Sequence, residues 1–225
     1  MEMQDSCVPP GLEYLVELDQ VLIHQLIEVF ELLTGWEMRN KYVLKNNMGQ
    51  QFLFAKEQST FCSRWCCGNI RAFQMGINDN NEQEVLRLDR PLNCAGCCTP
   101  CCLQELEVTN QGMLLGSVHQ EWSFCTPWAG KYSIKNASGD VVFRLKAPCC
   151  VCSCGSDIIF PVFTADWEQQ VGEIRKVWRG FCVESLTDVD NFTVTFPKDL
   201  DVRMKALFLG AAFLIEYIYY ERKQQ

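Results

Sequence analysis

Apolar and polar residues alternate with a period of two along much of the chain, and this pattern predicts β-strands with one buried face. The clearest example is residues 192–196, and residues 103–108 and 113–122 also fit strands. Similar segments lie at residues 22–30, 52–54, 71–77, 84–88, 141–143, 158–163 and 171–177. We therefore expect about twelve short, evenly spaced strands and few helices.

A repeated motif organises these strands. The pattern Lys-Tyr-x-x-Lys-Asn-x-x-Gly occurs at residues 41–49 and again at residues 131–139. Both copies predict a hairpin, because Asn and Gly tolerate positive φ in the turn and a β-rich strand follows. Cysteines and two further strands follow each hairpin, which indicates an internal duplication at about residues 41–90 and 131–180. Antiparallel halves would leave unpaired edges, so we favour closure into one barrel.

Helical signals are confined to the ends of the chain. Residues 9–15 predict a short helix or turn, and Asp199 or Asp201 is suited to cap a final helix over about residues 200–221. That helix is too short for the roughly 20 apolar residues of a membrane span, and Glu216 interrupts it. We favour a helix that fills the barrel over a single membrane crossing. Its apolar side chains include Ala206, Leu207, Phe208, Leu209, Phe213, Leu214 and Ile215.

Composition describes a folded, acidic chain. Apolar residues make up 48% of the sequence, and only residues 1–8 and 222–225 have the character of flexible ends. We expect residues 9–225 to form one domain. The formal net charge of -8 disfavours nucleic acid as a partner. Affinity for a membrane must then come from apolar groups or acyl chains. Because the sequence contains no Walker A loop, nucleophile elbow or dinucleotide fingerprint, we expect neither an enzyme nor the use of ATP.

Cysteines supply the first candidate site. The N-terminal residues lack the features of a signal peptide, so we expect the 15 cysteines to stay reduced. Five of them lie between residues 94 and 102. The cluster is open to three interpretations: acylation, zinc binding by Cys-x-x-Cys pairs, or burial as small apolar residues. We favour acylation, because neighbouring side chains in extended backbone point to opposite sides and make poor zinc ligands.

Acidic residues supply the second candidate site. Asp188, Asp190 and Asp199 occupy the first, third and twelfth positions of a calcium-loop template. Thr193 stands where an EF-hand requires glycine, and residues 192–196 alternate like a strand. A strand followed by helix-capping aspartates is the alternative interpretation of this segment.

Four motifs occur in a specific order: Pro-Pro-Gly-Leu-Glu-Tyr-Leu at residues 9–15, the cysteine cluster at 94–102, Asp-x-Asp-Asn-Phe at 188–192, and Phe-Pro-x-Asp-Leu-Asp-Val at 196–202. In these motifs the chain resembles the phospholipid scramblases, from Pro9 almost to its end. The resemblance implies a tubby-like fold, in which a closed twelve-stranded antiparallel barrel encloses a hydrophobic C-terminal helix. It also implies calcium-dependent, ATP-independent movement of membrane phospholipids in both directions between leaflets.

The resemblance further implies functional residues and a location. The family's palmitoylated cluster corresponds to Cys97, Cys98, Cys101 and Cys102, and its calcium segment to Asp188, Asp190, Phe192, Val194, Phe196 and Asp199. The implied cofactors are Ca²⁺ and covalently attached palmitate, with zinc as the disfavoured alternative. The implied location is the cytoplasmic face of the plasma membrane, and both a nuclear pool and an oligomer stay open. A palmitoylated tubby-like module that binds or signals without transport is the alternative function.

Overall fold

The computed structural model describes residues 8–26, 39–59, 71–93, 103–122, 130–149, 151, 156–178 and 191–220. Within these ranges the chain forms a short 3-10 helix η1 (Glu13–Leu15), twelve strands and a long helix α4 (Val202–Tyr219). The strands are β1 (Gln20–Leu26), β2 (Lys41–Lys45), β3 (Gln51–Gln58), β4 (Phe73–Asp79), β5 (Glu84–Arg90), β6 (Glu105–Asn110), β7 (Met113–Glu121), β8 (Lys131–Asn136), β9 (Val141–Lys146), β10 (Ile158–Thr164), β11 (Gln170–Lys176) and β12 (Asn191–Thr195).

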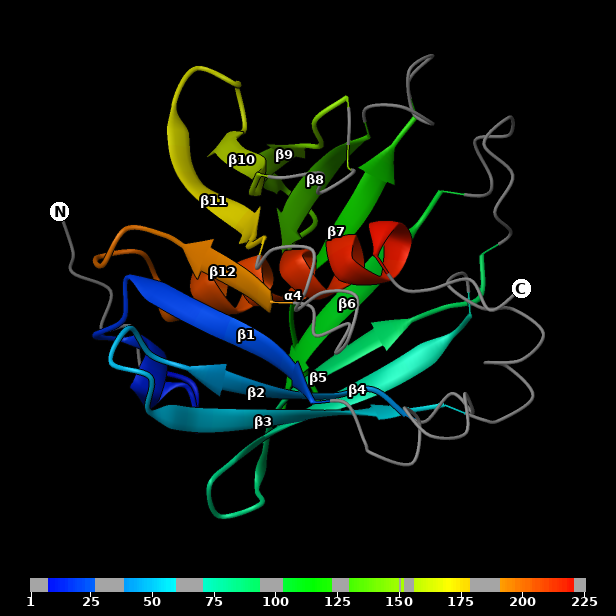
Figure 1. Ribbon diagram of the computed structural model, residues 1–225. Coiled ribbons are helices and arrows are strands. Elements are labelled where there is room, and N and C mark those ends of the chain that lie inside the picture. Colours follow the sequence, from blue (N-terminus) through cyan, green and yellow to red (C-terminus); the bar gives the residue numbers. More distant parts are fainter. Residues whose placement is uncertain are drawn as a thin grey trace, which may run out of the picture.

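The strands form one closed barrel around α4 (Figure 1). Each strand pairs antiparallel with its neighbours in sequence, and β12 pairs with β1 to complete the ring. Closure leaves none of the twelve described strands with an unpaired edge. The predicted fold class, a closed twelve-stranded antiparallel barrel that encloses a C-terminal helix, is confirmed.

The repeated motif forms two matching hairpins, β2–β3 and β8–β9, six strands apart around the barrel. In the first turn, Asn46 Oδ1 accepts hydrogen bonds from the backbone N–H groups of Met48 (3.0 Å) and Gln50 (2.9 Å). Asn136 Oδ1 does the same for Ser138 (3.0 Å) and Asp140 (2.9 Å). These Asx turns explain why asparagine occupies the same place in both copies of the motif.

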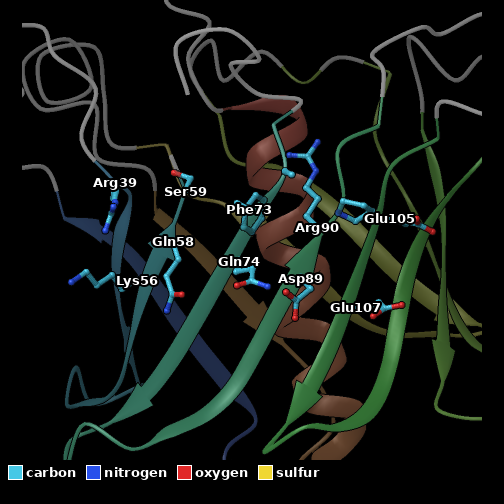
Figure 2. Close-up of a pocket in the computed structure, with 12 residues that line it drawn as sticks. Arg39, Lys56, Gln58, Ser59, Phe73, Gln74, Asp89, Arg90, Glu105 and Glu107 are labelled. Atoms are coloured by element: carbon cyan, nitrogen blue, oxygen red, sulfur yellow. The ribbon is translucent and has the colours of Figure 1, made fainter. Parts of the chain in front are cut away.

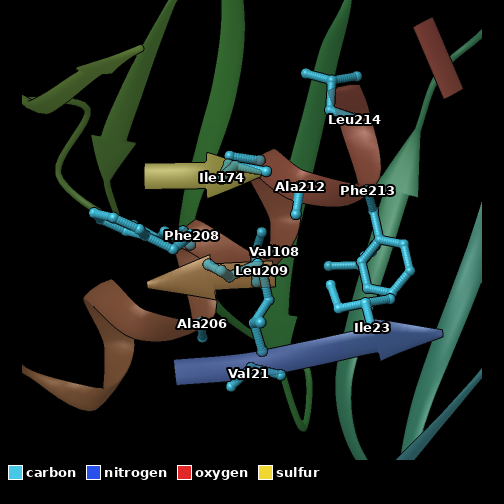
Figure 3. Packing of buried hydrophobic residues seen from close by; sticks show 14 of the residues in the cluster. Val21, Ile23, Val108, Ile174, Ala206, Phe208, Leu209, Ala212, Phe213 and Leu214 are labelled. Carbon is cyan, nitrogen blue, oxygen red and sulfur yellow. The ribbon is translucent and has the colours of Figure 1, made fainter. Parts of the chain in front are cut away.

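Helix α4 fills the interior of the barrel (Figure 3). Of the two predicted capping residues, Asp201 is the N-cap, and its side chain accepts a hydrogen bond from Arg203 N at 2.8 Å. The seven apolar side chains predicted for this helix are each at most 1% exposed. No helix in the described ranges is long and apolar enough to cross a bilayer. The structure therefore shows the barrel-filling arrangement.

The two ends of the barrel differ in the length of their connections. Five of the turns that join consecutive strands are short, and they lie at one end, which we call the turn end. Six long connections start and finish at the opposite end, the loop end, where α4 also finishes. They span residues 27–40, 59–72, 91–104, 122–130, 147–157 and 177–190.

Candidate functional site

The loop end collects most of the chemistry predicted from the sequence. Every cysteine except Cys7 lies in one of the six long connections. The predicted acylation residues Cys97, Cys98, Cys101 and Cys102 fall in the connection from β5 to β6, and Asp188 and Asp190 fall in the connection from β11 to β12. These six residues lie outside the described ranges. The described strand ends nevertheless direct both connections to the same end of the barrel.

The other members of the predicted calcium segment lie along and beyond β12. Phe192, Val194 and Phe196 are at most 3% exposed, and their side chains belong to the core. Asp199 is exposed at the turn end. A strand of five residues, about 17 Å long, separates Asp199 from the connection that holds Asp188 and Asp190. The described residues thus do not bring the two ends of the segment together, and no cluster of three metal-ligating side chains occurs among them.

A buried ion pair lies beneath the loop end. Arg71 donates two hydrogen bonds to Glu57, from Nε to Oε1 at 2.7 Å and from Nη2 to Oε2 at 2.8 Å, and both side chains are fully buried. Tyr217 of α4 donates its hydroxyl to the same carboxylate at 2.9 Å. Burial acts to raise the pKa of Glu57, but the hydrogen bonds and charge of Arg71, with help from Tyr217, lower it overall. Glu57 is therefore held as the anion.

Glu216, which interrupts the apolar run of α4, has a partner in the barrel wall. It is 2% exposed, and its carboxylate accepts a hydrogen bond from the Tyr42 hydroxyl at 2.6 Å. One turn further, Tyr132 donates its hydroxyl to that of Tyr219 at 2.9 Å, and burial raises the pKa of Tyr132 well above its ordinary value. Polar groups near the end of α4 thus attach the helix to opposite sides of the wall.

A groove of about 1030 Å³ opens on the outer surface of β3 to β6, toward the loop end (Figure 2). Basic side chains, Arg39 and Lys56, line one side of it. Acidic side chains line the other side, namely Asp89, Glu105 and Glu107, and the uncharged Gln58 and Gln74 lie between the two sides. Sequence patterns do not reveal this groove, because its residues come from separate strands and each has the pattern of an ordinary outward-facing position.

Exposed apolar side chains occur at both ends of the barrel. At the loop end, Leu92 and Trp122 are 59% and 52% exposed. At the turn end, Met48 and Met113 are 74% and 51% exposed. These side chains do not distinguish the ends, whereas the distribution of cysteines does.

Known proteins resemble this chain over almost its whole length. A family model described as Scramblase matches residues 2–222. Phospholipid scramblase 1 of Rattus norvegicus is 50% identical over 215 residues, and Phospholipid scramblase 2 of Bos taurus is 50% identical over 214 residues. Phospholipid scramblase 1 of Homo sapiens is 49% identical over 214 residues.

Each of these three alignments covers 95% of this chain, but a smaller share of the relative. The covered shares are 63% of the rat protein, 72% of the bovine protein and 66% of the human protein. The chain thus spans slightly less than two thirds of the rat protein's length. The family match extends over nearly every residue and agrees with identities close to one half, so the chain belongs to the scramblase family.

Proposed function

We propose that this chain is a phospholipid scramblase, which moves phospholipids in both directions between the leaflets of a membrane, under the control of Ca²⁺ and without ATP. The observation that carries the proposal is the family match over residues 2–222, together with relatives that are named phospholipid scramblases. The lack of nucleotide-binding motifs in the sequence supports movement of lipid down its own gradient. The chain would act as a translocator without catalytic chemistry.

Attachment through acyl chains fits the arrangement of the barrel. We propose that Cys97, Cys98, Cys101 and Cys102 carry palmitate and hold the loop end at the cytoplasmic face of the plasma membrane. Each buried methylene contributes about 0.8 kcal/mol, and two or more chains give stable attachment. A net charge of -8 gives little attraction to anionic lipids, so acyl chains are a suitable source of affinity.

Calcium control would operate at the same end of the barrel. We propose that Asp188 and Asp190 contribute carboxylate ligands, because oxygen ligands suit Ca²⁺. Both residues lie in the connection from β11 to β12, and that connection starts and finishes at the loop end. An ion bound there would reduce the negative charge of the protein close to the lipid surface. Asp199 lies at the turn end and would not be a ligand of the same ion.

The lipid path would lie outside the barrel. Helix α4 fills the interior, and the residues from Ala206 to Tyr217 are all buried. Because a phospholipid head group needs a polar, solvated route, the packed core gives it none. We propose that the head group travels along the outer surface, with the barrel and α4 intact.

The filled barrel also supports a second candidate function. A palmitoylated tubby-like module that binds or signals at the membrane would need no lipid path at all. Both candidates predict membrane attachment, and only the first predicts lipid movement.

A vesicle assay distinguishes the scramblase from the tethered module. The acylated protein is reconstituted into vesicles that carry a fluorescent phospholipid in both leaflets. We expect Ca²⁺ to bring the inner-leaflet lipid within reach of an external quencher faster than in protein-free vesicles. Asp188→Asn/Asp190→Asn should lose this calcium response, whereas the matched variant Asp199→Asn should keep it. If calcium leaves the rate equal to that of protein-free vesicles, the scramblase proposal fails and the tethered module stands.

A further inference from the structure

The groove on β3 to β6 has a regular construction that follows from strand register. Gln58 lies opposite Gln74, Gln74 lies opposite Asp89, and Asp89 lies opposite Glu107. These four residues form one row across β3, β4, β5 and β6 on the outer face of the barrel. Neighbouring strands are about 4.8 Å apart, so the row is about 14 Å long. The row becomes acidic toward β6.

The opposite side of the groove is basic. Lys56 projects outward from β3, and Arg39 precedes β2; both side chains are exposed (Figure 2). Lys56 also lies directly opposite Lys41 on β2. The accessible charges of the groove are thus positive on one side and negative on the other, separated by two glutamines. Arg90 also lines the groove near the acidic side, but it is 3% exposed and donates a hydrogen bond to Gln104 at 2.6 Å.

The strand pairing here does not favour stability. Like charges that face each other across two strands are destabilising. Lys41 opposite Lys56 and Asp89 opposite Glu107 are two such pairs on neighbouring parts of one surface. Departures from favourable pairing are expected where residues serve a function. Lys56, Asp89 and Glu107, which line the groove, are therefore suited to an external ligand.

The four charges are also available to a ligand. Among the described residues, Arg39, Lys56, Asp89 and Glu107 take part in no ion pair with another described side chain. Arg87, by contrast, donates two hydrogen bonds to Glu84, at 2.8 and 3.0 Å, just beyond this row. The groove charges thus differ from a nearby pair that is already satisfied.

We propose that the groove binds a zwitterionic phospholipid head group, in which a phosphate and an ammonium are covalently joined. The phosphate would contact Arg39 and Lys56, and the ammonium would contact Asp89, Glu105 and Glu107. An anion alone would be repelled by the acidic side, and a cation alone by the basic side. The groove opens toward the loop end, the end proposed to face the membrane.

The inference deepens the proposed function, because it takes a membrane lipid as the source of the head group. The same chemistry also occurs in soluble glycerophosphodiesters. Binding of glycerophosphoethanolamine, which has an ammonium, and glycerophosphoglycerol, which has none, should be measured by calorimetry on the full chain. Vesicles of phosphatidylcholine, added as competitor, then test the membrane source.

Three variants separate the two sides of the groove from a structural effect. The acidic-side variant is Asp89→Asn/Glu105→Gln/Glu107→Gln, and the basic-side variant is Arg39→Gln/Lys56→Gln. The matched control is Lys146→Gln/Glu168→Gln, which removes exposed charges from the opposite wall, on β9 and after β10. Each variant should unfold at a urea concentration no lower than the wild type does, because the substituted side chains lie on the surface.

The acidic-side variant should bind glycerophosphoethanolamine about tenfold more weakly, because it loses the charge-assisted contacts to the ammonium. It should bind glycerophosphoglycerol at least as tightly as the wild type does, because the repulsion from the acidic side is removed. The basic-side variant should bind both compounds about tenfold more weakly. The control should bind like the wild type. Equal affinities in all four proteins would overturn the inference, and so would vesicles that fail to compete.

Failure of this inference is distinguishable from failure of the proposed function. Calcium-dependent scrambling with no effect of the groove variants on binding would remove the head-group site alone. The expected binding pattern without any lipid movement would support the head-group site and remove the scramblase proposal alone.

Discussion

Arg71 and Glu57 form a bidentate ion pair, with hydrogen bonds of 2.7 and 2.8 Å, that is fully withdrawn from solvent beneath the loop end of the barrel. Tyr217 connects the pair to α4 through a hydrogen bond to Glu57, and the Arg71 guanidinium lies 5.2 Å from the centre of the Tyr217 ring. The pair therefore joins β3, the following connection and the core helix. Because neither charge is solvated, removal of one residue would leave the other charge buried without a partner.

Arg71→Ala should destabilise the protein by about 3–5 kcal/mol, because it leaves the Glu57 carboxylate buried without its partner. The double variant Glu57→Leu/Arg71→Met removes both charges and should recover most of that loss. Urea unfolding measures the free energy of unfolding of both variants. A double variant as unstable as Arg71→Ala would contradict the assignment of the loss to an uncompensated charge.

The same pair predicts a dependence of stability on pH. Because the pKa of Glu57 is lowered in the folded protein, its stabilisation is fully present above the ordinary value of 4.5 and is lost as the pH falls through the lower folded value. Stability measured across this acidic range should fall less steeply for Glu57→Gln than for the wild type. Parallel curves for the two proteins would contradict the prediction.

Gly210→Ala should destabilise the protein although alanine favours helix by about 1 kcal/mol. A Cβ at this position would lie 2.6 Å from Val108 Cγ2 on β6, and overpacking of a core costs about 1–3 kcal/mol. Val108→Ala removes the obstructing methyl groups. Urea unfolding should therefore show that the double variant loses less than the sum of the single losses; a simple sum would indicate that the two positions do not touch.

Lys205→Met should loosen the turn end of the barrel. The buried Lys205 Nζ donates to the carbonyls of Leu15, Val16, Leu18 and Lys198 at 2.7–2.9 Å. Loss of this donor should cost about 1–3 kcal/mol. Hydrogen exchange should become faster in residues 12–18, while Arg203→Met, an exposed neighbour on α4, should leave it unchanged. Unchanged exchange in both variants would contradict the prediction.

Cys97→Ser/Cys98→Ser/Cys101→Ser/Cys102→Ser should move the protein from the membrane to the soluble fraction of cells that palmitoylate it. The reason is the loss of acyl chains, each worth about 0.8 kcal/mol per buried methylene. Cys149→Ser, which changes an exposed free cysteine in another loop-end connection, is the matched control and should stay on the membrane. Persistent membrane binding of the fourfold variant would contradict attachment through this cluster.

Local patterns in the sequence predicted most of the fold. Alternation identified the strands, and the repeated asparagine turns identified two hairpins, because both signals depend on neighbouring residues. The short apolar run with Glu216 correctly indicated a helix inside the barrel. The sequence offered both Asp199 and Asp201 as caps, and only the structure selects Asp201.

Local sequence patterns do not identify contacts between residues that are far apart in the chain. The pairing of Tyr42 with Glu216 spans 174 positions, and that of Lys205 with Leu15 spans 190. The groove likewise depends on register, which places Gln58, Gln74, Asp89 and Glu107 in one row. Each position alone has the pattern of an ordinary exposed strand residue, so no local pattern indicates that the four act together.

The central claim is that lipid moves outside an intact barrel that still contains α4. Cysteines introduced as Val108→Cys/Gly210→Cys should form a disulfide, because a Cβ at 210 lies 2.6 Å from Val108 Cγ2. Calcium-dependent scrambling should be measured in the same vesicles before and after reduction, with Val108→Cys as control. We expect equal rates in both states. Scrambling that appears only after reduction, or in neither state while the control is active, would contradict the account.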